Sequence, residues 1–212
     1  IVYNDNFGST FTVWKAAEVL GKINLPVPGK HNIYNALAAT SVALELEIPF
    51  AKIAEAFAKF KNADRRFQFK GEANGIAVID DYGHHPTEIV ATLSAAKNGS
   101  GGRRTVVLFQ PHRYSRTKDL MNEFALWFNN AYVLYVLDIY AASENPIDGI
   151  TAEILTENIK KHGHKNAQYI GDIDFAAENI VENLRENDLV ITLGAGTVTR
   201  LSDEILDNLR RR

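Results

Sequence analysis

Cysteine is absent from the 212-residue sequence. Its absence excludes a disulfide framework and a thiolate metal site, and it fits a reducing, cytoplasmic location. The sequence also has no apolar run near the roughly 18 residues that a membrane-spanning helix requires. Because no signal peptide is visible either, we expect a cytoplasmic protein with no membrane partner.

A surplus of positive charge is also missing. The formal net charge at pH 7 is -3, with 23 Lys and Arg residues against 26 Asp and Glu residues. Proteins that bind nucleic acid usually carry a basic surplus, so we expect no nucleic-acid partner. The hydrophobic fraction is 46% and the charged fraction is 23%. These values are typical of a globular protein and not of a disordered chain.

The sequence lacks a phosphate-binding GxxxxGK(S/T) loop. Neither Gly21-Lys22 nor Gly29-Lys30 is followed by Ser or Thr, so this segment offers no P-loop. Methionine is scarce too. The single one is Met121, and the chain opens with the apolar residues Ile1-Val2-Tyr3, as if inside a strand. We therefore expect a fragment whose amino-terminal part is missing.

The first third of the sequence predicts a hairpin followed by two helices. Residues 11–25 alternate loosely between apolar and polar side chains, which indicates an antiparallel hairpin. Helical spacing begins at Asn32, and a second helix follows Pro49. Residues 61–71 break the helical pattern with clustered charge. We place a domain boundary there and expect one domain over residues 1–70 and another over residues 71–212.

Beyond the boundary, a strand followed by a helix recurs about five times. The expected pairs are 76–79 with 86–97, 105–109 with 117–129, 132–137 with 151–161, 168–170 with 175–186, and 189–193 with 199–209. Such a succession predicts an α/β fold with a doubly wound, mostly parallel, Rossmann-like sheet. It would be preceded by the tail of a second α/β domain, formed by the hairpin and its helices.

Polar residues of this half follow the expected strands. They are Asp80 to His85, Gln110 to Arg116, Asp138 to Glu144, and the Gly194-Ala195-Gly196 turn. The carboxyl ends of parallel strands meet at one edge of a sheet, where ligands bind, so we expect these loops to share one pocket. The glycine turn resembles the start of a dinucleotide fingerprint, but Thr199 stands where the third glycine belongs. It is equally explained as a tight strand-to-helix turn.

The loop after residue 79 carries Asp80, Asp81, His84 and His85. Carboxylate and imidazole are common metal ligands, but adjacent histidines in an extended turn point apart, so we expect no protein metal site. A binding loop is the favoured interpretation, because a carboxylate at a strand end can accept hydrogen bonds from a ribose and imidazole can orient a polar substrate. Alternatively, the acids only cap the helix that begins at Pro86.

Guanidinium groups recur at two places that suit an anion. Arg113 and Arg116 stand three residues apart beside His112, and paired arginines form planar forks for carboxylate or phosphate oxygens. Arg66, at the domain boundary, can serve the same purpose if a ligand lies in a cleft there. Surface arginines that only form salt bridges are the alternative in both cases.

Four segments together resemble the Mur ligase family: Gly29 to Ala36, Arg65-Arg66-Phe67, Asp80 to Glu88, and Phe109 to Thr117. Within the family, the two long segments resemble the member that joins L-alanine to UDP-N-acetylmuramate. The resemblance implies three domains, of which this chain would hold the end of the central ATPase domain and the whole carboxyl-terminal domain. The alternatives are a recycling member that attaches a tripeptide to the same sugar nucleotide, and a non-catalytic nucleotide-binding module.

The resemblance also implies a reaction and its residues. In an ATP- and Mg²⁺-dependent step of peptidoglycan synthesis, the sugar carboxylate is phosphorylated and the amine of L-alanine attacks the acyl phosphate. Contacts to ATP would come from His31, Asn32, Asn35, Arg66 and Asp81. Substrate-binding residues would be Tyr82, His84, His85, His112, Arg113 and Arg116, of which His84, Arg113 and Arg116 would be catalytic. ATP and Mg²⁺ would be bound mainly by the missing upstream domain, so the chain alone is expected to be inactive.

Overall fold

The computed structural model describes residues 1–4 and 7–212. These residues divide into two compact units, residues 1–63 with 94–102 and residues 64–93 with 103–212. Within the described ranges, every helix is too short or too polar to cross a bilayer. The division into domains at residue 70 stays a prediction, and the change between compact units falls a few residues earlier, at Ala63 and Asp64.

The first unit contains a three-stranded antiparallel sheet and two helices. The strands β1 (Val2–Tyr3), β2 (Ser9–Lys15) and β3 (Glu18–Leu25) lie in the order β1-β2-β3. The helices α1 (Lys30–Glu45) and α2 (Phe50–Ala58) follow. The predicted hairpin is confirmed, because β2 pairs antiparallel with β3 and sets Phe11 opposite Ile23.

A small apolar core holds this unit together. Alternate residues of the hairpin, including Phe11 and Ile23, are buried, as expected where one face of an antiparallel sheet packs on a core. Ile33 of α1 belongs to the same cluster, and Phe50 and Phe57 of α2 pack against it. Both helices therefore cover one face of the hairpin.

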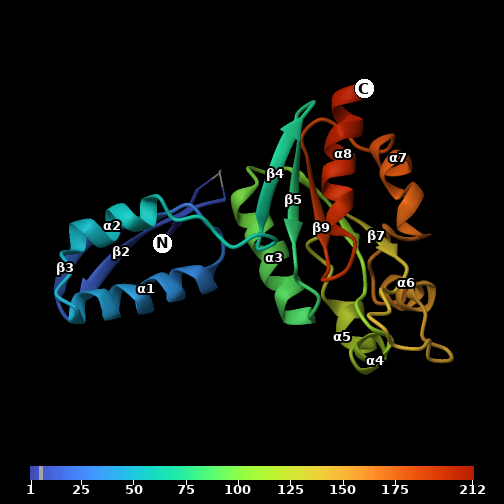
Figure 1. Cartoon of the computed structure of the whole chain (residues 1–212), viewed down its shortest axis with the longest axis horizontal. Coiled ribbons are helices and arrows are strands. Elements are labelled where there is room, and N and C mark those ends of the chain that lie inside the picture. Colours follow the sequence, from blue (N-terminus) through green and yellow to red (C-terminus); the bar gives the residue numbers. More distant parts are fainter. Residues whose placement is uncertain (5–6) are drawn as a thin grey trace. The chain divides into compact units, whose positions relative to one another are not determined.

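The second unit is built on a six-stranded sheet in the order β4-β5-β9-β6-β7-β8 (Figure 1). The bounds are β4 (Gln68–Ala73), β5 (Ile76–Asp81), β6 (Arg104–Phe109), β7 (Val133–Leu137), β8 (Ala167–Gly171) and β9 (Asp188–Leu193). Only β4 pairs antiparallel, with β5, and the other pairings are parallel. The prediction of a mostly parallel sheet is confirmed.

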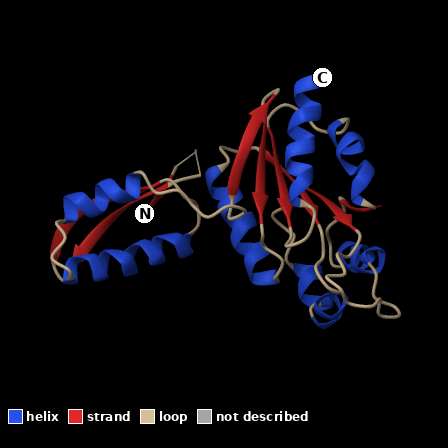
Figure 2. Cartoon of the chain, in the orientation of Figure 1, coloured by secondary structure: helices blue, strands red, loops and turns tan. Residues whose placement is uncertain are grey.

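Helices lie on both faces of this sheet, as the blue and red elements of Figure 2 show. The helices are α3 (Pro86–Gly99), α4 (Tyr114–Asp119), α5 (Met121–Leu126), α6 (Ala152–Lys161), α7 (Ala176–Val181) and α8 (Thr199–Arg211). One face packs against α7 and α8 in a continuous apolar cluster. On the other face, Phe109 contacts Phe124 and Phe128 at ring distances of 5.5 and 5.0 Å. Every residue of β5 and β9 is buried, which explains their unbroken apolar runs.

Two predicted helices differ from the structure, and one strand was missed. The helix expected over residues 117–129 is two short helices, α4 and α5, which meet at the non-helical residue Leu120. The helix expected over residues 175–186 ends at Val181, after a 3-10 turn at Ile173–Phe175. Strand β4 was not predicted at all. It lies at the edge of the sheet and is mostly half-buried or exposed, so it lacks an apolar signal.

Candidate functional site

The loops that follow β5, β6, β7 and β9 come together at one edge of the sheet, as the sequence predicted. The rings of His84 and His112 lie 5.6 Å apart, although the two residues follow different strands. His112 also stacks on Tyr140, which follows β7, at 5.5 Å. Gln110 accepts a hydrogen bond from the backbone N–H of Val198, which follows β9. Four separate segments thus build one site.

The centre of the site is a pair of histidines in a partly buried setting. Burial lowers the pKa of His84, and the positive charge of Arg116 adds to the effect against the hydrogen bond to the Tyr82 carbonyl. Burial also lowers the pKa of His112, assisted by His84 and Arg116. Both imidazoles are therefore neutral near pH 7.

The hydrogen-bond partners fix a different tautomer for each ring. His84 Nδ1 lies 3.0 Å from the carbonyl oxygen of Tyr82, which can only accept, so Nδ1 carries the proton and Nε2 has a free lone pair. His112 Nδ1 lies 3.2 Å from Nη1 of Arg116, which can only donate, so the proton of His112 is on Nε2. One ring can therefore accept a proton, while the other offers an N–H donor.

Glu88 holds the loop that carries the histidines. Its carboxylate accepts the backbone N–H groups of His84 and His85 at 3.0 and 3.1 Å, at the start of α3. Arg66 donates to the same carboxylate at 3.3 Å. Burial opposes ionisation of Glu88, but these donors outweigh it and lower the pKa of the carboxyl group. Glu88, rather than Asp80 or Asp81, is thus the residue that caps this helix.

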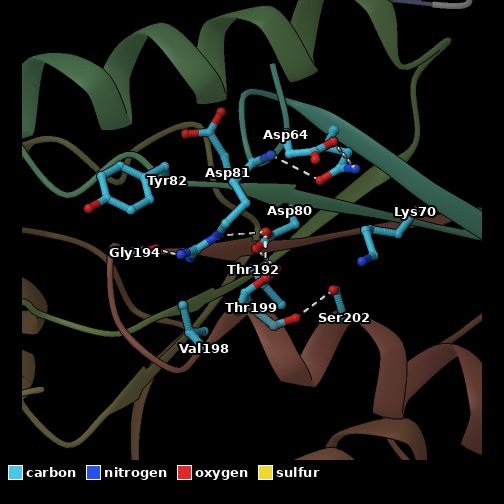
Figure 3. A network of polar contacts seen from close by, with 12 residues as sticks. Asp64, Lys70, Asp80, Asp81, Tyr82, Thr192, Gly194, Val198, Thr199 and Ser202 are labelled. Atoms are coloured by element: carbon cyan, nitrogen blue, oxygen red, sulfur yellow. Dashed lines mark hydrogen bonds and ion pairs between the residues drawn. The ribbon is translucent and has the colours of Figure 1, made fainter. Parts of the chain in front are cut away.

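Asp80 and Asp81 both accept hydrogen bonds from the protein itself, and Figure 3 shows those made to Asp80. Asp81 accepts the backbone N–H groups of Phe67 and Gly83, each at 2.7 Å. Burial raises the pKa of Asp81 in spite of these bonds. Asp80 is fully buried and receives hydrogen bonds from the side chains of Arg65, Thr192 and Thr199. Among residues 1–4 and 7–212, no group of three or more His, Asp or Glu side chains is placed to hold a metal ion.

The remaining predicted residues lie at the rim or in the other unit. Arg113 is exposed and adopts a φ of 73° immediately before α4. His85 is exposed, and its Nδ1 lies 3.0 Å from the Thr87 hydroxyl, so the two adjacent imidazoles do serve different neighbours. The predicted ATP contacts His31, Asn32 and Asn35 lie in the first turns of α1, where His31 and Asn35 are exposed.

The structure also gives a reason for the glycines of the Gly194-Ala195-Gly196 turn, which the sequence left with two interpretations. A Cβ atom added to Gly196 would lie 2.4 Å from Oε1 of Gln110 and 2.7 Å from Tyr140, so the glycine permits close packing against both. Gly194 has a φ of 148°, and a Cβ there would lie 2.7 Å from the Gln110 carbonyl oxygen. The glycine turn is therefore explained by packing. Linear spacing contains no signal for such contacts between distant segments.

Comparison with known proteins identifies the family. A family model described as Mur ligase, glutamate ligase domain, matches residues 65–196, which cover the six-stranded unit except for its last helix. The chain belongs to the Mur ligase family. The resemblance of the sequence motifs to this family is thereby confirmed.

Curated relatives agree with this assignment. The chain is 52% identical over 205 residues to the UDP-N-acetylmuramate–L-alanine ligase of Trichlorobacter lovleyi, with 97% of this chain and 45% of that protein covered. It is 55% identical over 197 residues to the protein of the same name from Desulfotalea psychrophila, with 93% and 43% covered. The chain thus spans less than half the length of these Mur ligases.

A solved structure shows the same fold. The crystal structure of UDP-N-acetylmuramate-alanine ligase from Thermotoga maritima matches with a TM-score of 0.83 and 27% sequence identity, over 97% of this chain and 44% of that chain. The architecture of this Mur ligase segment is therefore shared with an experimentally determined member.

Proposed function

We propose that the full-length protein is an ATP-dependent ligase that joins L-alanine to UDP-N-acetylmuramate in peptidoglycan synthesis. The names of the curated relatives support this substrate pair. The site supports it independently, because a small amino acid carries one anionic and one protonated group. An arginine and a neutral imidazole at one sheet edge complement those two groups.

The observation that carries the proposal is the contact between Arg116 and the histidine pair. Arg116 lies 3.2 Å from His112, whose ring lies 5.6 Å from that of His84. Arg116, with Arg113 at the rim, would bind the alanine carboxylate. Nε2 of His84 would accept a proton from the alanine ammonium group and leave a nucleophilic amine. His112, Tyr82 and His85 complete the substrate-binding set that we propose.

The chemistry proceeds through an acyl phosphate. Phosphoryl transfer from ATP to the lactyl carboxylate of the sugar nucleotide provides the activated carbonyl. The amine attacks that carbon and the C–N bond forms. The C–O bond to phosphate then breaks, the electron pair leaves on phosphate, and the extra proton of the new amide nitrogen passes to the departing phosphate. Arg113 and Arg116 would stabilise the oxyanion that develops between these steps, which is the task of fixed cationic donors in a closed site.

ATP contacts from this segment are proposed for five residues, and the structure suits them unequally. Arg66 pairs with Glu88 at 3.3 Å and has a half-exposed side chain, and an exposed guanidinium group can also meet an anion. Asp81 already accepts two backbone N–H groups and is 6% exposed, which leaves little surface for a ribose. His31, Asn32 and Asn35 remain predicted contacts of the adenine end. We propose that most of the ATP and Mg²⁺ site belongs to parts of the full-length protein outside this segment, and that the reaction is cytoplasmic.

A substrate comparison on the full-length protein tests the proposal. The protein is given ATP, UDP-N-acetylmuramate and either L-alanine or the recycled tripeptide, and the product is identified by mass. We expect a product with L-alanine and little with the tripeptide. Preference for the tripeptide would establish the recycling ligase instead. Tight binding of ATP by the 212-residue chain alone, measured by calorimetry, would favour a free-standing nucleotide-binding module.

A further inference from the structure

The adjacent residues Arg65 and Arg66 both lie over the Tyr82 ring, at 4.9 and 5.6 Å, but they pair with different carboxylates. The Arg66 side chain is 49% exposed and pairs with Glu88 at the site. The Arg65 side chain is 23% exposed and pairs with the fully buried carboxylate of Asp80 at 3.0 Å. Arg65 has a φ of 58°, a left-handed conformation that is uncommon for arginine. With this conformation, the two neighbouring guanidinium groups pair with carboxylates at opposite ends of the 80–88 loop.

Asp80, which is labelled in Figure 3, anchors Arg65 through an ion pair. Its Oδ2 accepts from Nε of Arg65 at 3.0 Å and from the hydroxyl of Thr199 at 2.7 Å, while its Oδ1 accepts from the hydroxyl of Thr192 at 2.7 Å. A buried ion pair is weak evidence for stability, because desolvation offsets most of the attraction. It does fix geometry, since the planar guanidinium fork permits few arrangements.

Arg65 then reaches two parts of the site that follow different strands. Its Nη2 donates to the carbonyl oxygen of Gly194 at 2.6 Å, after β9. Its backbone carbonyl accepts the N–H of Tyr82 at 2.6 Å, after β5. The guanidinium carbon also lies 4.9 Å from the centre of the Tyr82 ring, within cation–π range. Tyr82 is therefore held by Arg65 at its backbone and at its ring.

Tyr82 in turn contacts His84, one of the two histidines of the site. Its ring stands edge-on to that of His84 at 5.3 Å, and its carbonyl oxygen fixes the His84 tautomer. We propose that Arg65, anchored by Asp80, is a positioning residue that sets Tyr82 and His84 for the incoming amino acid. The inference rests on the proposed ligase function. Arg65 touches no substrate in this scheme and acts only through Tyr82.

Arg65→Lys in the full-length protein is the direct test. Lysine keeps the positive charge beside Asp80. It lacks the second N–H donor that bonds to the Gly194 carbonyl oxygen and the planar guanidinium group that lies over the Tyr82 ring. We expect KM for L-alanine to rise about tenfold, because small displacements of binding groups are costly, while KM for ATP stays within about twofold. The same KM for L-alanine as in the unmodified protein would overturn the proposal.

Arg103→Lys is a matched control. Arg103 has the same side-chain exposure of 23%, pairs with Glu72 at 3.0 Å and donates to the Gly75 carbonyl. It lies by the turn before β5, at the other end of that strand, so its replacement should leave both KM values unchanged. An equal rise of KM for L-alanine in both variants would show a general loss of stability and would refute a positioning role.

A second variant guards against failure to fold. Arg65→Met combined with Asp80→Leu removes both charges of the ion pair, so that neither partner is left unpaired, and replacing a whole ion pair by apolar side chains is often neutral or stabilising. The double variant keeps the backbone bond to Tyr82 but lacks the guanidinium contacts with the Tyr82 ring and the Gly194 carbonyl oxygen, so KM for L-alanine should still rise about tenfold. A folded double variant with unchanged KM would reject the proposal. If the unmodified full-length protein makes no product from L-alanine, the proposed function has failed rather than the role of Arg65.

Discussion

Replacement of Gly194 by alanine measures how tightly the β9–α8 turn is packed. Gly194 has a φ of 148°, which side chains rarely adopt, and its added Cβ would lie 2.7 Å from the backbone oxygen of Gln110. The conformation costs of order 1–3 kcal/mol, and the overlap with a fixed carbonyl adds about 1–3 kcal/mol. We therefore expect Gly194→Ala to lower the free energy of unfolding by about 3 kcal/mol.

The assay is thermal unfolding of the full-length protein by calorimetry. For a unit of this size, a loss of about 3 kcal/mol lowers the melting temperature by roughly 6–12 °C. Gly149→Ala is the control, because Gly149 also has a positive φ, 73°, but no heavy atom of the described residues lies within 4 Å of a Cβ built there, apart from its neighbours. The control should lose only about 1 kcal/mol from the conformation. Equal losses in the two variants would refute the packing argument.

Further predictions concern the pH dependence of the histidine pair and the role of Arg113. Burial lowers the pKa of His84 and His112. In a pH–rate profile, kcat/KM for L-alanine should therefore stay constant down to about pH 6.5, the ordinary pKa of histidine, and fall only below it. Because the pKa of each ring is lower in the folded protein than in the unfolded chain, the unfolded chain takes up the two protons at a higher pH. The free energy of unfolding should therefore decrease as the pH falls below about 6.5. A fall of kcat/KM that begins above pH 7 would contradict the neutral pair. Arg113→Ala should lower kcat/KM by about a hundredfold, with unfolding free energy within about 0.5 kcal/mol, whereas normal turnover with a lowered melting temperature would contradict its assignment.

The fold could be predicted where burial leaves a continuous pattern. Residues 76–79 and 189–193 are mostly apolar and rich in Ile and Val because their strands are covered on both faces. Both strands were located from the sequence. Strand β4 could not be predicted, because an edge strand with exposed side chains has no such pattern. The break at Leu120 between α4 and α5 also left no trace in the helical spacing.

The site was predictable to the extent that topology determines it. Once the strands were expected to be parallel, the residues after them had to share an edge, and His84 and His112 do lie together. The bond from Arg65 to Gly194 joins residues 129 positions apart, and nothing in either local sequence indicates it. The position of Tyr140 on His112 is likewise a result of packing between loops.

The opposite tautomers of the two histidines set a rule for inhibitor chemistry. A ligand atom that meets Nε2 of His84 has to bring a hydrogen, and one that meets Nε2 of His112 has to bring a lone pair. A hydroxyl or primary amide meets both demands, whereas an ether or an N,N-dimethylated amide has only lone pairs and cannot donate to Nε2 of His84. Compounds of these two kinds, matched in shape, should therefore separate sharply in affinity.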